Sequence, residues 1–130
     1  GRVLAVLGDD GYPYTVPLDF VYEDGKLYFH CAGEGHKIDA VRRCDKATFC
    51  VIDAGERAPD EWWLTFRSVI VFGRIRILDD RAEVLSRVRA LGLKYAAPDY
   101  VEKELQKDGK RVQCMEMTVE HMTGKRVREK

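Results

Sequence analysis

The chain has 130 residues, a length that suits one domain with its own hydrophobic core. Its 22 basic and 22 acidic residues give a formal net charge of zero, which argues against a protein that binds nucleic acid through a global positive field. No apolar run approaches the ~20 residues needed to cross a bilayer, so no membrane segment is expected.

Two further features of the composition indicate where the protein works. The four cysteines form no C-x-x-C pair and no secretory leader is visible, so reduced thiols in a cytoplasmic protein are expected. The sequence starts at Gly1 directly on an apolar run, which leads us to expect that the natural protein has a segment before it.

In the first half of the chain, apolar runs and alternation predict four strands and one helix. The strands are expected at Arg2–Gly8, Tyr14–Tyr22, Leu27–Cys31 and Ala47–Ile52. Asp9–Gly11 predicts a hairpin turn in which Gly11 takes a positive φ. Pro17 cannot donate to a ladder, so the strand that contains it is expected at a sheet edge. A short helix is expected from His36 to about Arg43, with Ile38 and Val41 facing inward.

The second half predicts two long strands separated by two helices. The expected strands are Trp63–Leu78, with a bend or bulge at Gly73, and Val112–His121, followed by a basic tail over Gly124–Lys130. Asp80–Glu83 resembles a capping box that opens an amphipathic helix, and Pro98–Lys107 predicts a more polar one. Trp62 and Trp63 are adjacent and cannot both face a core, so one is expected to be exposed, at an interface or against a ligand.

Six strands joined mostly as hairpins predict a mainly β fold, a small antiparallel barrel with helical insertions. A barrel of about six strands is filled by its own side chains. A large ligand is therefore expected outside the barrel, and a crevice between two subunits is the obvious place.

The expected start of the helix at His36 predicts an anion site. Gly33 and Gly35 precede it and no Ser, Thr, Asp or Asn is placed to cap it, so free N–H groups are expected at the positive end of the helix dipole. Lys37 in the first turn opposes that dipole, and a bound phosphate would neutralise both. The alternative is that Lys37 only points into solvent.

Three familiar motifs fail on this sequence. A dinucleotide-binding fingerprint would need a glycine where Ile38 stands, and a P-loop would need one where Val119 stands. The spacing of His30, Cys31 and the residues near them matches no common zinc pattern, so no metal site is expected.

Two strand segments have a functional and a structural interpretation. Val16–Leu18 is suited to lie against a flat aromatic ring, or is an edge strand protected by its proline. Arg67 and Ser68 are suited to bind a phosphate or carboxylate. The alternative is a surface arginine paired with Glu61 or Asp60.

These stretches together resemble the flavin-binding split β-barrel superfamily of the pyridoxamine 5'-phosphate oxidases, and within it the Nim-type 5-nitroimidazole resistance proteins. The resemblance rests on residues quoted in chain order: Gly11–Leu18, Leu27–Ala32, Gly35–Ala40, Arg67–Arg74 and Glu120–Lys125. It implies a single domain over residues 1–130 with a six-stranded antiparallel split barrel, preceded by an N-terminal helix of the family that this chain lacks.

The resemblance also implies FMN at a homodimer interface and a small-molecule substrate. Val16, Pro17 and Leu18 would lie along the flavin ring, with His30, Cys31 and Ala32 approaching the ring and the ribityl chain. His36 and Lys37 would hold the phosphate, and Arg67, Ser68 and Val69 would contribute from the long strand, in the same or the neighbouring subunit.

The activity that the resemblance implies is that of an FMN-dependent oxidoreductase or nitroreductase, which would connect the protein with antibiotic resistance. His30 is the candidate proton donor, because an imidazole titrates near neutrality; its alternatives are a structural histidine or a ribityl contact. The alternative functions are a flavin carrier or sensor without turnover, and a split barrel that binds deazaflavin or haem.

Overall fold

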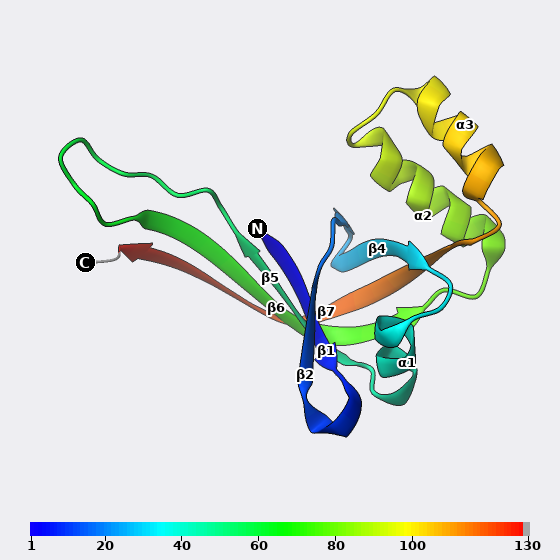
Figure 1. Ribbon diagram of the computed structural model, residues 1–130, viewed down its shortest axis with the longest axis horizontal. Helices are drawn as coiled ribbons and strands as arrows, with labels where there is room; N and C mark the ends of the chain where they lie inside the picture. Colours follow the sequence, from blue (N-terminus) through cyan, green and yellow to red (C-terminus); the bar gives the residue numbers. More distant parts are fainter. Residues whose placement is uncertain (129–130) are drawn as a thin grey trace.

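The computed structural model describes residues 1–128, which form seven strands and three α-helices around one curled sheet (Figure 1). The strands are β1 (Arg2–Leu7), β2 (Pro13–Pro17), β3 (Val21–Glu23), β4 (Lys26–Ala32), β5 (Lys46–Ile52), β6 (Thr65–Ile77) and β7 (Val112–Arg128). The helices are α1 (His36–Arg43), α2 (Arg81–Leu93) and α3 (Pro98–Asp108), with a 3-10 turn at Asp9–Gly11. The prediction of a mainly β antiparallel fold with helical insertions is confirmed, with seven strands instead of six.

The sheet has the order β2-β1-β5-β6-β7-β4-β3, and every pair of neighbours is antiparallel. β2 and β3 lie at opposite edges, although only residues 18–20 separate them in the chain. Such a link reaches at most ~14 Å from Pro17 to Val21. The sheet must therefore curl until its two edges approach, which gives a barrel that is split rather than closed.

The prediction of one strand over Tyr14–Tyr22 is wrong, because the chain leaves β2 after Pro17 and begins β3 at Val21. Asp19 holds the crossing: its carboxylate accepts the Phe20 N–H at 2.9 Å and the Tyr95 hydroxyl at 2.7 Å, and it pairs with the Arg2 guanidinium. The edge position predicted for the Pro17 strand is confirmed.

The barrel interior is a continuous apolar core. Phe49 is fully buried and meets the rings of Phe29 and Phe20 edge-on, at centroid distances of 4.9 and 5.2 Å. Such aromatic pairs stabilise a core beyond the area they bury. The helix α1 covers the barrel with Ile38 and Val41, the two residues predicted to face inward. A second buried cluster lies between the sheet and α2 and consists of Tyr28, Leu78, Val84 and Cys114.

The long strands β6 and β7 extend into an arm, which we define as Thr65–Phe72, His121–Arg128 and the loop 53–64; its inner part, which includes Val71, still packs in the barrel core (Figure 1). The register shifts between Phe72 and Gly73, which confirms the bulge predicted at this glycine. Residues 124–128, predicted to be part of a basic tail, belong to β7; the rest of that tail lies outside the described residues.

The two helices α2 and α3 form a pair outside the barrel (Figure 1). α2 begins at the predicted cap, where the Asp80 carboxylate accepts the Ala82 N–H at 3.0 Å. The helix α3 begins with Pro98 at its first position, where a missing N–H is harmless. No helix within residues 1–128 combines the length and the apolar character that a membrane crossing requires.

Candidate functional site

The start of α1 follows the loop predicted from the sequence. Gly35 has a φ of 134°, a backbone conformation that favours glycine, and no side chain caps the helix. The first helical bond runs from the Asp39 N–H to the Gly35 carbonyl at 3.2 Å. Within residues 1–128, the N–H groups of His36, Lys37 and Ile38 have no hydrogen-bond acceptor. Three donors at the positive end of a helix form a suitable place for an anion.

The first turn of α1 contacts the β1–β2 hairpin through His36. Its ring lies 4.5 Å from that of Tyr14, measured between centroids, and its Nδ1 is 3.5 Å from an Asp9 carboxylate oxygen. The same carboxylate accepts from Arg43 at 2.9 Å. The hairpin therefore fixes the His36 side chain, while Lys37 remains without an ion-pair partner among the described residues. The role predicted for both residues, binding a phosphate, stays a prediction.

At the end of β4, neighbouring side chains point to opposite faces of the sheet. Cys31 is 6% exposed and faces the barrel interior, where burial raises the pKa of its thiol to about 11 despite the opposing effect of Lys37. His30 faces outward to α2 and α3, where it lines a pocket. Ala32 is exposed and leads into the loop before α1. A ligand at this strand end would meet the backbone of Cys31 rather than its thiol.

The segment Val16–Leu18 lies at the β2 edge of the sheet. Val16 and Leu18 are half-buried against the core, and Pro17 between them is exposed. The edge leaves backbone groups of β2 open to a ligand or to another chain.

The segment Arg67–Val69 belongs to the arm. The Arg67 guanidinium is 3.8 Å from one carboxylate oxygen of Asp53, and the other oxygen accepts the Arg67 backbone N–H at 3.0 Å. Its predicted alternative partner Glu61 pairs instead with Arg128, at 3.0 Å. Arg67 is largely exposed, while Ser68 is half-buried and Val69 packs against the core.

The structure brings some of the predicted site residues together and keeps others apart. β4 ends directly before α1, and the Tyr14–His36 contact brings β2 close to the same helix. Arg67 lies elsewhere. His30 is at the level of Leu78, because His30 pairs with Cys114 and the Cys114 carbonyl accepts the Leu78 N–H. Measured along the chain from Leu78 through β6, Arg67 is ~35 Å away. One ligand therefore cannot touch both His30 and Arg67 of one chain.

Three residues of α3 that share the pocket with His30 were not predicted to be site residues. Tyr100, Glu104 and Asp108 are four residues apart and therefore lie on one face of the helix. That spacing was visible in the sequence. What it could not show is that this face turns toward β4, because the α2–α3 connection decides the orientation of the helix.

Comparisons with known proteins agree with this architecture. The family model for pyridoxamine 5'-phosphate oxidase matches residues 2–126. A candidate 5-nitroimidazole antibiotic resistance protein from Bacteroides thetaiotaomicron is 21% identical, with a TM-score of 0.78 over 96% of this chain and 75% of that one. A FAD-binding protein from Mesorhizobium loti is 24% identical, with a TM-score of 0.67 over 97% and 85%.

A third solved structure of similar fold binds two cofactors. It is a FAD and heme binding protein from Mycobacterium smegmatis, 19% identical, with a TM-score of 0.72 over 95% of this chain and 63% of that one. No curated protein matches the sequence significantly. At these identities the solved structures establish the split-barrel fold, and the family match extends over nearly the whole chain. The chain therefore belongs to the pyridoxamine 5'-phosphate oxidase family.

Proposed function

We propose that this protein is a flavoprotein that binds FMN in a crevice shared by two copies of the chain and passes electrons to a small electrophile such as a nitro compound. The observation that carries the proposal is the start of α1. Three unpartnered N–H groups lie there, and Lys37 belongs to the same first turn of the helix; a phosphate dianion is a ligand that could pair with both.

The residues present fit a flavin mononucleotide. Its phosphate would take the N–H groups of His36, Lys37 and Ile38, and its ring would lie along the exposed edge at Pro17. Bound FMN supplies the redox chemistry, as cofactors generally do. The family match and the FAD-binding proteins of similar fold support a flavin.

The role of the protein chain would be to position the reactants and to supply a proton. His30 stands next to the strand end at Ala32 and lines a pocket with α3. An imidazole there can donate a proton to a reduced substrate and regain it from solvent, because the pocket is open on one side.

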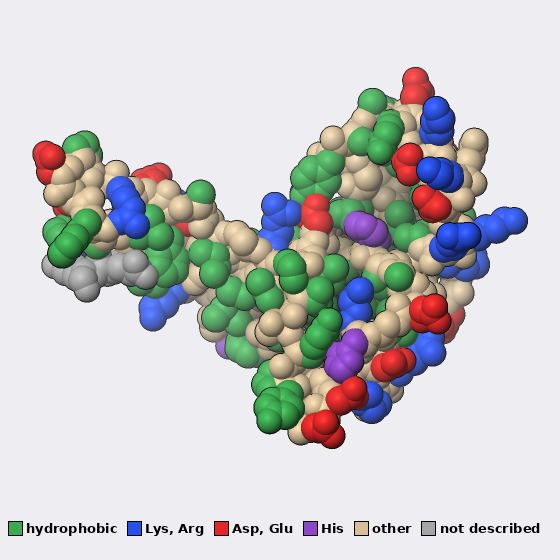
Figure 2. Space-filling model, in the orientation of Figure 1, with side chains coloured by type: hydrophobic (Ala, Val, Ile, Leu, Met, Phe, Trp, Pro, Cys, Tyr) green, Lys and Arg blue, Asp and Glu red, His purple; other side chains and the backbone are tan. Residues whose placement is uncertain are grey.

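The distance between the two groups of predicted site residues supports a site that is shared between two copies. Arg67–Val69 lie on the arm, and a second copy can bring its own arm to the β4–α1 end. Trp62, Phe72 and Met122 on the arm are exposed, by 85%, 43% and 49%. Figure 2 shows hydrophobic side chains gathered along the arm and the neighbouring surface.

A flavin titration with a matched pair of variants tests the phosphate site. Lys37→Ala removes the proposed charge-assisted bond and should weaken FMN binding by ~1.5–3 kcal/mol, or about 10- to 150-fold. Lys103→Ala removes a lysine from the exposed side of α3 and should leave the dissociation constant unchanged. Fluorescence quenching of FMN measures both. An unchanged dissociation constant for Lys37→Ala, or no binding by the wild type, would refute the proposal.

Analytical ultracentrifugation with flavin absorbance tests the shared crevice. Trp62→Ser changes an exposed side chain of the arm and should shift the protein to a monomer that loses flavin, without altering its circular dichroism. Leu93→Ser, at the end of α2, is the control for a similar loss of exposed apolar surface. A wild-type monomer that retains FMN contradicts the shared site.

A further inference from the structure

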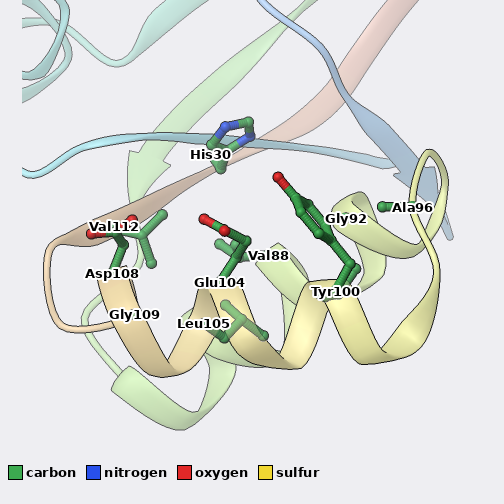
Figure 3. A pocket seen from close by; sticks show the side chains of 11 residues that line it. His30, Val88, Gly92, Ala96, Tyr100, Glu104, Leu105, Asp108, Gly109 and Val112 are labelled. Atoms are coloured by element: carbon green, nitrogen blue, oxygen red, sulfur yellow. The ribbon is translucent and has the colours of Figure 1, made fainter.

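A pocket of about 320 Å³ lies between α2, α3 and the end of β4, outside the barrel core. Its volume is within the range of sites that bind small molecules. Apolar residues of both helices form its floor, among them Val88, Val101 and Leu105. Figure 3 shows the polar groups around this floor. His30 lies on one side, and the side chains of Tyr100 and Glu104 on α3 point toward His30.

The charged groups of the pocket are of one sign. Glu104 and Asp108 are four residues apart on α3, so their backbones are separated by ~6 Å along the helix axis. Among residues 1–128, no lysine or arginine side chain lines the pocket. Neither carboxylate has a cationic side chain within 4.0 Å in residues 1–128, although Glu102 on the other side of α3 pairs with Arg89.

Tyr100 adds an aromatic wall one helical turn before Glu104. A tyrosine face attracts cations and packs against flat rings. Unpaired carboxylates beside apolar surface favour a ligand that supplies the missing positive charge and an apolar body together. An anionic ligand would meet like charge, and a neutral one would form no ion pair with the half-buried Glu104 or the exposed Asp108.

We infer that this pocket binds a small, flat, positively charged organic molecule, an amidinium or a protonated heteroaromatic amine. Its cationic end would face Glu104 and Asp108, and its ring would lie between Tyr100 and the apolar floor. Because His30 belongs both to this pocket and to the proposed flavin site, the inference rests on the proposed function in one respect: it assigns the cation as the substrate or inhibitor class of that site.

The test uses benzamidine, a cation at pH 7, and benzamide, its neutral analogue of the same shape. Binding of each to the cofactor-free wild-type protein is measured by isothermal titration calorimetry, and repeated with FMN added. We expect benzamidine to bind at least tenfold more tightly than benzamide. The double variant Glu104→Gln/Asp108→Asn should abolish that preference, whereas Glu102→Gln, on the opposite side of the same helix, should preserve it.

The possible outcomes separate the two proposals. Equal binding of benzamidine and benzamide to the wild type, or a preference that persists in Glu104→Gln/Asp108→Asn, overturns the inference whether or not FMN binds. A tenfold preference lost only in that double variant supports it. If the preference is present but FMN does not bind, the proposed flavin function fails while the cation pocket stands. With FMN bound, benzamidine should also compete with electron acceptors, and the absence of competition would overturn its assignment to the flavin site.

Discussion

Gly73 lies at the bulge in the β6–β7 pairing, where the backbone of β7 is in close contact with it. A Cβ added there would overlap with the carbonyl oxygen of Thr118 and would lie 3.3 Å from the Met117 side chain. A carbon atom should stay at least ~3.3 Å from a carbonyl oxygen. The substitution Gly73→Ala therefore forces the backbones of the two strands apart, because the obstructing atom belongs to the main chain and no rotamer change can move it.

The magnitude follows from the bonds that such a separation disturbs. Thr118 pairs with Arg74 on one side and with Lys26 on the other, and the Val119 N–H bonds to the Gly25 carbonyl at 3.0 Å. Loss of two such bonds, at ~1–1.5 kcal/mol each, with local strain added, predicts a destabilisation of ~2–4 kcal/mol. In urea, with a slope of ~1.5 kcal/mol per M for a domain of this size, the midpoint should fall by ~1–3 M.

The matched control is Gly124→Ala on the same pair of strands. A Cβ at Gly124 would have only the Ser68 carbonyl oxygen within reach, at 4.0 Å. The free energy of unfolding of Gly124→Ala should therefore stay within ~0.5 kcal/mol of the wild type, and its urea midpoint within ~0.3 M. Equal midpoints for the two variants would refute the reasoning that close approach of β6 and β7 fixes this glycine.

Two predictions concern the buried thiols. Burial raises the pKa of Cys31 to about 11 and that of Cys114 to about 12. At pH 8 the thiolate fraction of Cys31 should thus be about 100-fold below that of an ordinary thiol. Iodoacetamide should therefore modify the half-buried Cys44 and Cys50 first. Peptide mass spectrometry measures the order of modification, and early labelling of Cys31 would contradict this prediction. Both folded-state pKa values lie above the unfolded value of 9.0. The stability that the neutral buried thiols provide is therefore complete below pH 9. It is lost as the pH rises toward 11, by about 1 kcal/mol per pH unit for each thiol. Urea midpoints at pH 8 and 10.5 measure the loss, which Cys31→Ala should reduce and which a flat profile would disprove.

Local sequence rules predicted the elements whose cause is local. The helix His36–Arg43 was predicted with its observed bounds, because glycine placement and the apolar spacing of Ile38 and Val41 are contained in the segment. The Asp80 cap and the bulge at Gly73 were predicted for the same reason. Each of these depends on residues close together in the chain.

The sequence interpretation failed where distant residues decide the structure. The break between β2 and β3 depends on Asp19 meeting Arg2 and Tyr95, and Tyr95 is 76 residues away. The length of β7 depends on β6 lying beside it, since Lys125 and Arg126 have no apolar alternation of their own. For the candidate site, the pattern identified the start of α1, but the separation of Arg67 from His30 required the strand register.

The position of β7 has a consequence for the synthesis of this protein. β7 is synthesised after the other six strands described, yet it lies between β6 and β4 in the sheet. Until it emerges, the nascent chain holds two separate half-sheets, β2-β1-β5-β6 and β4-β3, each with an open inner edge. Such edges are templates for pairing with other chains. Translation that stops within β7 should therefore yield aggregates rather than a partly folded monomer, and chaperone demand should peak just before β7 is complete.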